Sequence, residues 1–202
     1  MCSSDLTDPR DLHRFDIGII VNPNNPDGRL VDIETLLAIS GGLASKNGHL
    51  IVDEAFIDVL DRKLSLVPHV EQCRAIILRS FGKTYGLAGL RLGFAIAPHQ
   101  IVARIRDELG PWAISGPAVE IGRRALADTN WLTETSERLQ SDVKRLDQLL
   151  RTLGLEPVGG SALFRLAKSA DATSAFNALA GIGILVRAFR EKPHWLRFGM
   201  PG

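Results

Sequence analysis

The sequence has few cysteines, little net charge and no long apolar run, and each of these absences excludes a class of protein. Cys2 and Cys73 are the only cysteines in 202 residues, so we expect neither a disulfide framework nor a metal site. The formal net charge of +1 gives no broad attraction to nucleic acid or to anionic membranes. No apolar run is long enough to span a membrane, and no basic stretch before an apolar core marks a signal peptide. These absences favour a cytoplasmic protein.

The composition is otherwise that of an ordinary globular protein, with 45% apolar and 23% charged residues, and the length allows one or two hydrophobic cores. In the first half, short apolar runs alternate with helical or turn-rich segments. Because these runs are continuous rather than alternating with polar residues, we expect an α/β fold, with a mostly parallel sheet and helices on both faces. The expected strands are residues 15–21, 49–54, 75–78 and 92–97.

A helix is expected over residues 31–46, with Asp32 as its N-terminal cap and Asn47 near its end. The pattern changes after Pro98, where longer helices predominate. We expect a large domain over residues 1–97 and a smaller α+β domain over 98–202, incomplete at its end. Its expected helices are residues 100–109, 116–127, 131–153 and 172–179, and its expected strands 155–158, 162–167, 184–189 and 195–198. Residues 1–14 are expected to be a loop or a non-native leader, and residues 62–72 to be irregular.

One glycine-rich segment, residues 79–93, lies between two expected strands and holds groups suited to chemistry. Its glycines let the backbone turn sharply or approach a ligand closely. Ser80, Lys83 and Arg91 could converge there on one anion. Partial desolvation would make the lysine amine a better nucleophile. The apolar residues expected to wall it are Phe81, Tyr85 and Leu87.

Three interpretations compete for Gly82-Lys83-Thr84, and the plainest is a basic loop on a solvated surface. The tripeptide ends like a P-loop, G-x-x-x-x-G-K-[ST], but the first glycine of that pattern would fall at Ile77, so we reject a nucleotide site. The third interpretation uses the wider pattern of Ser-x-x-Lys followed eight residues later by arginine within Gly-Leu-Arg-Leu-Gly. This pattern resembles the cofactor segment of fold-type I pyridoxal-phosphate enzymes, the class I and II aminotransferases.

Three further motifs carry the same resemblance in the family's order. Asn25-Pro26-Asp27-Gly28 resembles its Asn-Pro-x-Gly element, and Asp53-Glu54-Ala55-Phe56 resembles its Asp-Glu-Ala-Tyr/Phe element. Arg197 resembles the family's arginine near the C-terminus. Together the motifs cover residues 17–200, and they imply pyridoxal 5'-phosphate as the cofactor.

The resemblance implies a role for each motif residue. Lys83 would be the catalytic residue, forming the covalent imine with the cofactor and later moving protons. Asp53 would pair with the pyridine nitrogen and keep it protonated, which strengthens the ring as an electron sink. Asn25 would donate a hydrogen bond to the phenolate oxygen. Ser80 and Arg91 would bind the cofactor phosphate.

For the substrate, the resemblance implies that Arg197 binds a carboxylate with both of its guanidinium prongs. Arg187 is a weaker candidate for a second anionic group. Taken without the family, several of these residues have plain structural interpretations that stay open. Asp53 could cap or form an ion pair, Asn25 could serve a turn, and Arg91 and Arg187 could be surface arginines. Glu54 is interpreted as structural.

Two departures from the family pattern bear on the site. Gly82 stands where a serine or threonine often precedes the lysine, so one side-chain hydrogen bond to the phosphate is missing or is replaced by the backbone. Phe56 replaces a tyrosine, so Asn25 would serve the phenolate oxygen more alone. The family's upstream phosphate-binding loop and ring-stacking aromatic have no counterpart before Asn22. We therefore expect a fragment, poorly stable and inactive by itself.

Within the family, the motifs resemble the histidinol-phosphate aminotransferase branch, and residues 110–115 favour its threonine-phosphate decarboxylases. The implied reaction is loss of carbon dioxide from L-threonine O-3-phosphate, giving aminopropanol phosphate for cobalamin. The alternative is amino transfer from histidinol phosphate or a related amino acid. Outside enzymes, an aminotransferase-like sensor domain or an inactive fragment remains, although no helix-turn-helix accompanies it. The family also implies a homodimer for the full-length protein.

Overall fold

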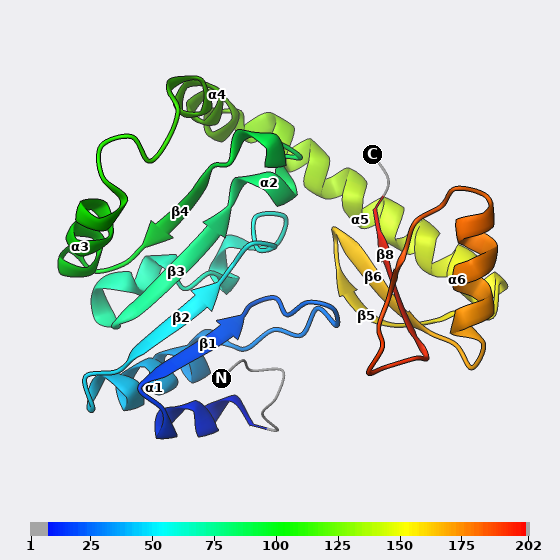
Figure 1. Cartoon of the computed structure of the whole chain (residues 1–202), viewed down its shortest axis with the longest axis horizontal. Coiled ribbons are helices and arrows are strands. Elements are labelled where there is room, and N and C mark those ends of the chain that lie inside the picture. The colour runs from blue at the N-terminus through cyan, green and yellow to red at the C-terminus, as the bar shows by residue number, and fades with distance from the viewer. Residues whose placement is uncertain (1–7, 201–202) are drawn as a thin grey trace. The chain divides into compact units, whose positions relative to one another are not determined.

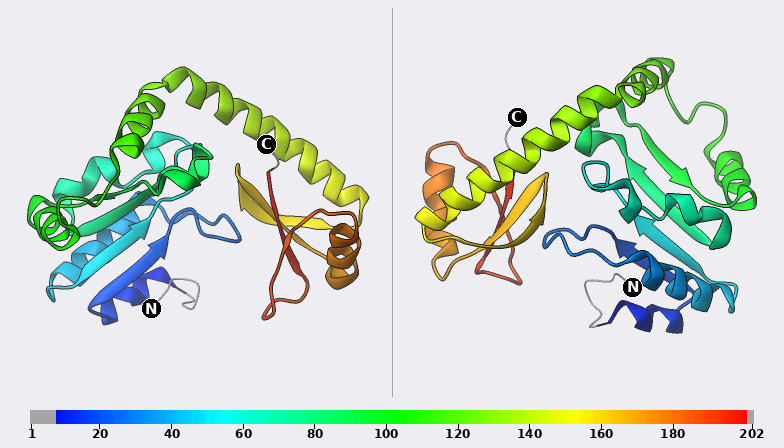
Figure 2. Two further views of the ribbon diagram at one scale, coloured as in Figure 1. Left: turned by 45° about the horizontal axis from the view of Figure 1, so that its top comes forward. Right: turned by 180° about the vertical axis from the view of Figure 1, so that it is seen from behind.

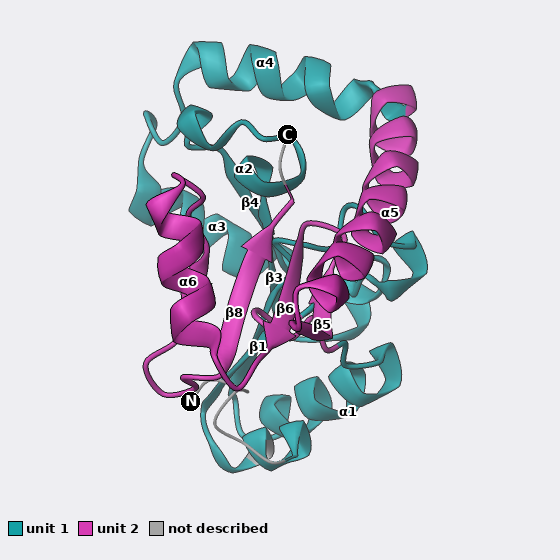
Figure 3. Ribbon diagram, turned by 90° about the vertical axis from the view of Figure 1, so that its right-hand side faces the viewer, with its two compact units in different colours: residues 1–23, 30–129 teal, residues 24–29, 130–202 magenta. Residues whose placement is uncertain are grey.

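The computed structural model describes residues 8–200, which form two compact units (Figures 1 and 3). Unit 1 comprises residues 1–23 and 30–129, and unit 2 comprises residues 24–29 and 130–202. A short loop, residues 24–29, therefore belongs with the second half of the chain although it lies within the first half of the sequence.

Unit 1 is built on a four-stranded sheet in the order β1-β2-β3-β4. The first three strands are parallel, and β4 is antiparallel to β3. The strands are β1 (Ile17–Val21), β2 (His49–Asp53), β3 (Ala75–Ser80) and β4 (Gly93–Ile96). Because the parallel strands run in one direction, their carboxyl ends meet at the same edge of the sheet. The predicted α/β class with a mostly parallel sheet is confirmed.

One face of this sheet carries the core of unit 1. Ile20, Val52 and Ile77 stand side by side across three strands and are fully buried, and Leu36 and Leu43 pack on them from α1 (Ile33–Ala44). Side chains alternate across a strand, so their neighbours in sequence point to the other face. There the exposed fraction is larger, reaching 52% at Ile17.

The signals at the ends of α1 act as the sequence predicts. The Asp32 carboxylate accepts a hydrogen bond of 2.7 Å from the Thr35 N–H and satisfies a donor of the first helical turn. Asn47 adopts the left-handed conformation, with φ of 61°, just after the helix. The other helices of unit 1 are α2 (Phe81–Thr84), α3 (His99–Leu109), α4 (Gly116–Ala127) and the 3₁₀ helices η2 (Pro9–Arg14), η3 (Arg62–Leu64), η4 (Val67–Gln72) and η5 (Ala88–Leu90).

Unit 2 is an antiparallel sheet with helices packed on one face (Figure 2). The strand order is β5-β6-β8-β7. Leu150 of α5 and Phe176 of α6 pack with Leu196 and Phe198 of β8 in one hydrophobic cluster. The elements are α5 (Thr129–Thr152), β5 (Glu156–Ser161), β6 (Phe164–Lys168), α6 (Ala172–Gly181), β7 (Arg187–Ala188) and β8 (Trp195–Gly199).

The border between the compact units follows Thr129 and not residue 97. The reason lies in packing, because α4 lies close to the chain just before β4, so that a Cβ on Gly122 would lie 2.5 Å from Leu92 Cδ2. The loop 24–29 joins unit 2 through backbone contacts, since the Gly160 N–H donates to the Asp27 carbonyl at 2.8 Å. A division into domains at 97–98 stays a prediction about the complete protein.

Three local expectations differ from the structure. Part of the predicted N-terminal loop is the 3₁₀ helix η2, while residues 1–7 of it lie outside the described residues. The irregular stretch 62–72 contains η3 and η4, and β7 is only two residues long. Within residues 8–200, no helix is both long and apolar enough to cross a membrane.

A pair of glycine substitutions tests this packing. Gly41→Ala lies inside α1 with open space around the added methyl, so it should raise the free energy of unfolding by about 0.5–1 kcal/mol. Gly48→Ala would place its methyl 2.5 Å from the Asp16 carbonyl oxygen and should lower it. Urea unfolding of both variants measures the difference, and shifts of the same sign would contradict the packing described here.

Candidate active site

Polar side chains gather at the carboxyl edge of the parallel strands in unit 1. Asp53 ends β2 opposite Leu78 of β3, and Ser80 ends β3 two residues later. Alternation along β3 places Ser80 on the same face as Leu78, and the register places Asp53 there too. Asp53 is half-buried, and its Oδ1 accepts a hydrogen bond of 3.0 Å from the Ala55 N–H. This hydrogen bond agrees with the plain capping interpretation and leaves Oδ2 for another partner.

Lys83 lies on the short helix α2 that follows Ser80. Its side chain is exposed, and its Nζ lies 5.8 Å from the centroid of the Phe56 ring. Of the residues predicted to wall it, Phe81 is buried and stacks on Tyr85 with ring centroids 4.5 Å apart. The aromatic neighbour of the lysine is thus the residue that replaces the family's tyrosine.

Close backbone packing explains why Gly82 precedes the lysine. A Cβ at Gly82 would lie 2.8 Å from the Ala88 Cα, which leaves no room for the serine or threonine often found there. The next hydroxyl along the chain belongs to Thr84, which is buried, and its Oγ1 has no hydrogen-bond partner among the described residues. A phosphate bound beside Gly82 would therefore meet backbone rather than a side-chain hydroxyl at that position.

Ser80 and Arg91 start from neighbouring positions of one hairpin. Ser80 pairs with Gly93 across β3 and β4, and the Phe81 N–H donates to the Leu92 carbonyl at 3.3 Å. The Ser80 side chain makes no capping hydrogen bond to α2. Arg91 is exposed, adopts a left-handed conformation with φ of 52°, and forms no ion pair within residues 8–200. A hydroxyl and a guanidinium at one end of a hairpin suit a phosphate group.

In unit 2, the asparagines of the loop 24–29 divide into two roles. Asn24 is buried and donates to the Asp27 carboxylate at 2.8 Å, which closes the loop on itself. Asn25 is exposed, and its Oδ1 accepts a hydrogen bond of 2.6 Å from Arg197 Nη1. In unit 1, just before the loop, buried Asn22 exchanges hydrogen bonds with the backbone of Val31. Of these asparagines, Asn25 is the one that binds another predicted site residue.

Arg187 and Arg197 lie directly opposite each other on β7 and β8. Like charges in this position repel each other. Burial lowers the pKa of Arg197 below its usual value, and the positive charge of Arg187 lowers it further. Each guanidinium also lies 5.5 Å from an aromatic ring centroid, Arg187 over Phe189 and Arg197 over Phe164. The pair is held in place and would be stabilised by an anion.

A polar network that was not predicted from the sequence lies near the carboxyl ends of β2 and β3. Glu54 is fully buried, and Arg79 joins it to Asp58. The alternation of side chains along a strand could have indicated this network, because Glu54 and Arg79 directly follow Asp53 and Leu78 and therefore share the opposite face of the sheet.

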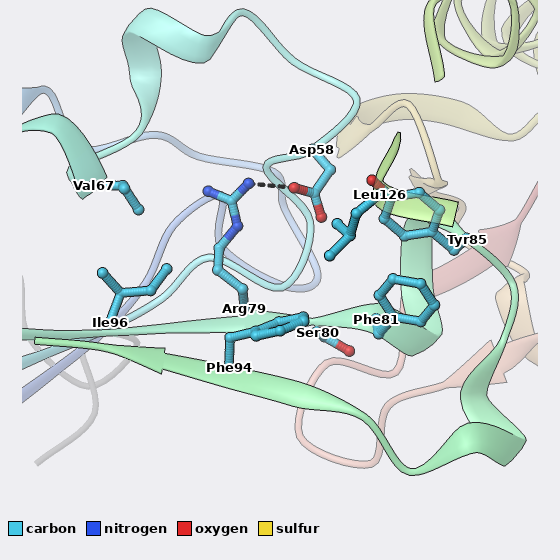
Figure 4. Close-up of a pocket in the computed structure, with 9 residues that line it drawn as sticks. All are labelled: Asp58, Val67, Arg79, Ser80, Phe81, Tyr85, Phe94, Ile96 and Leu126. Atoms are coloured by element: carbon cyan, nitrogen blue, oxygen red, sulfur yellow. Dashed lines mark hydrogen bonds and ion pairs between the residues drawn. The ribbon is translucent and has the colours of Figure 1, made fainter. Parts of the chain in front are cut away.

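Beside the network is a cavity of about 250 Å³ (Figure 4). Its lining residues are Asp58, Val67, Arg79, Ser80, Phe81, Tyr85, Phe94, Ile96 and Leu126.

Comparison with known proteins agrees with these features. The family model described as "Aminotransferase class I and II" matches residues 8–202. The threonine-phosphate decarboxylase of Pseudomonas aeruginosa is 41% identical over 190 residues, which are 94% of this chain and 57% of that protein. Histidinol-phosphate aminotransferase 1 of Legionella pneumophila (strain Lens) is 38% identical over 122 residues, 59% of this chain and 33% of that protein.

Among solved structures, the histidinol-phosphate aminotransferase from Clostridium acetobutylicum is similar, with a TM-score of 0.86 and 26% identity. The match covers 94% of this chain and 60% of that one. The chain thus spans little more than half the length of the Pseudomonas protein. It belongs to the class I and II aminotransferase family. Members of this family depend on pyridoxal 5'-phosphate, so the predicted cofactor is confirmed at the level of the family.

The arginine pair predicts opposite effects of one substitution on stability and on anion binding. Arg187→Gln removes a like charge facing Arg197, so the free energy of unfolding should rise by about 0.2–1 kcal/mol. Affinity for inorganic phosphate should fall about tenfold, because a charged hydrogen-bond donor is removed. Unfolding and titration calorimetry measure the two effects. Arg190→Gln, also exposed, is the control, and unchanged phosphate affinity in Arg187→Gln would contradict an anion site.

Proposed function

We propose that this chain is part of a pyridoxal-phosphate-dependent enzyme that removes carbon dioxide from L-threonine O-3-phosphate. The opposed pair Arg187 and Arg197 is the observation that carries this proposal. The substrate has two anionic groups, a carboxylate and a phosphate, and the pair offers two guanidinium groups. The similarity to the decarboxylase of Pseudomonas aeruginosa along nearly the whole chain gives further support.

The residues of unit 1 fit the cofactor. Ser80, with no capping bond, and Arg91, with no ion pair within residues 8–200, are suited to the phosphate group. Asp53 would hold a proton on the ring nitrogen through its remaining carboxylate oxygen. Lys83 presents an exposed amine for covalent attachment. In unit 2, Asn25 keeps its Nδ2 donor for the phenolate oxygen while its Oδ1 holds Arg197.

When bound, pyridoxal phosphate draws electron density away from the substrate's α-carbon. The bond that breaks is the one held perpendicular to the ring, so the choice of reaction depends on how the carboxylate is held. Arg197 would fix the carboxylate with two parallel hydrogen bonds, and Arg187 would fix the phosphate. Loss of carbon dioxide breaks the bond between carboxylate carbon and α-carbon. The Lys83 side chain, in its protonated ammonium form, could then deliver the proton that replaces the carboxylate and become a neutral amine.

A second candidate is amino transfer from histidinol phosphate. The likeness to the Clostridium acetobutylicum structure favours it, because that fold match has a TM-score of 0.86. Histidinol phosphate carries a phosphate but no carboxylate, so it would need only one of the two arginines. The two candidates therefore make different demands on unit 2 while sharing every residue assigned to the cofactor.

The enzyme is also proposed to act in the synthesis of cobalamin. The product, aminopropanol phosphate, would enter the side chain of cobalamin. We also propose a cytoplasmic homodimer for the complete protein and no activity for residues 1–202 by themselves, since they span little more than half of the relative's length. These parts come from the family resemblance and from the absence of a long apolar run.

The reaction is tested with the complete protein that contains this chain. Incubated with pyridoxal phosphate and threonine O-3-phosphate, it should release carbon dioxide at a rate proportional to enzyme concentration. Histidinol phosphate with 2-oxoglutarate should give no amino transfer. Amino transfer without carbon dioxide would replace the proposal by the second candidate and leave the cofactor residues unchanged. Neither activity, despite bound cofactor, would refute both substrates.

A further inference from the structure

We propose that Glu54, acting through Arg79, is a positioning residue that holds Asp53 and Phe56 in place for the cofactor; this role rests on the proposed function. The Glu54 side chain is fully buried, which is unusual for a carboxylate unless its charge is paired. Three donors surround it: Ser65 Oγ at 2.7 Å, the Leu66 N–H at 2.7 Å and Arg79 Nη1 at 2.9 Å.

The network joins the ends of the parallel strands β2 and β3 on one face of the sheet. The Glu54 N–H donates to the Leu78 carbonyl at 2.8 Å, so the β2–β3 pairing continues one step past the end of β2. At this step Glu54 and Arg79 point to one face, while Asp53 and Ser80 point to the other. Figure 4 shows the Arg79 guanidinium directed toward Asp58 and the Ser80 hydroxyl directed away from that pair. The ion pair on one face of the sheet therefore holds in place the strand ends that carry Asp53 and Ser80 on the other face.

Arg79 also binds the residues on both sides of Phe56. One of its terminal nitrogens binds Glu54 and the other binds Asp58, so both ends of the segment 54–58 are tied to the same guanidinium. Phe56 lies at the middle of that segment, with its ring 5.8 Å from Lys83 Nζ. Within the segment, the Ile57 N–H donates to the Glu54 carbonyl at 3.1 Å and the Ala55 N–H to Asp53. The two ion pairs of Arg79 thus fix the segment that carries Phe56 and, through the Ala55 N–H, the neighbouring Asp53 carboxylate.

The test compares Glu54→Gln with a matched control in the complete protein. Asp147→Asn removes one side of the Arg165–Asp147 pair, which lies in unit 2 and whose side chains are 17% and 15% exposed. Both variants should lower the unfolding midpoint. Only Glu54→Gln should weaken binding of pyridoxal phosphate to the apoprotein, by about tenfold, since a buried charged hydrogen bond is removed. It should also speed hydrogen exchange at the Ala55 and Ile57 amides in the apoprotein, and lower kcat more than it raises KM.

Asp58→Asn is the second variant, because Asp58 ties the other end of the segment 54–58 to Arg79 and is more exposed than Glu54. It should reproduce the faster exchange and weaker cofactor binding to a smaller degree, even if Glu54→Gln does not fold. Cofactor affinity and exchange at wild-type values in the folded variants would overturn the positioning role and leave Glu54 purely structural. Wild-type protein that binds no pyridoxal phosphate would refute the proposed function itself, before any variant is compared.

Discussion

The buried ion pair between Glu54 and Arg79 is the interaction on which the candidate site of unit 1 depends. A carboxylate with no exposed surface is tolerated only where donors replace water, and here a guanidinium, a hydroxyl and a backbone N–H do so. Removing Arg79 would leave the Glu54 charge buried without its guanidinium, which is far more destabilising than never having had the pair, whereas Arg79 without Glu54 still keeps Asp58. Because the pair lies where β2 and β3 end, it also fixes the positions of Asp53 and Ser80, which point to the opposite face of the sheet.

The proposed chemistry depends on two simple regularities of strands. Parallel strands end at one edge, so Asp53 and Ser80 lie at the same edge of the sheet although 27 positions separate them in sequence. Alternation then separates the residues assigned to the cofactor from those that support them. Unit 2 uses antiparallel pairing instead, which sets Arg187 against Arg197 and makes an anion the natural partner of both. In the proposed function, the two kinds of sheet would thus supply two kinds of binding group.

Local signals in the sequence predicted much of the fold, and long-range pairing marks where they ended. The limits of α1 follow from Asp32 and Asn47, both local signals, and the motifs around Asn25, Asp53 and Lys83 indicated the family from short patterns. Sequence could not show that Arg79 binds Glu54, 25 positions away, or that Arg197 binds Asn25, 172 positions away. Nor could it show that Phe81 turns inward and leaves Phe56 beside the lysine, because that depends on how the loop packs.

The central claim is that this fold presents Lys83 as the covalent anchor of pyridoxal phosphate, and one measurement tests it most directly. The complete protein loaded with the cofactor is reduced with borohydride, digested and analysed by peptide mass spectrometry. A reduced pyridoxal-phosphate adduct is expected on the peptide containing Lys83, and none in Lys83→Ala. An adduct on a different lysine of the wild-type protein, or one that persists on that variant at wild-type yield, would contradict it.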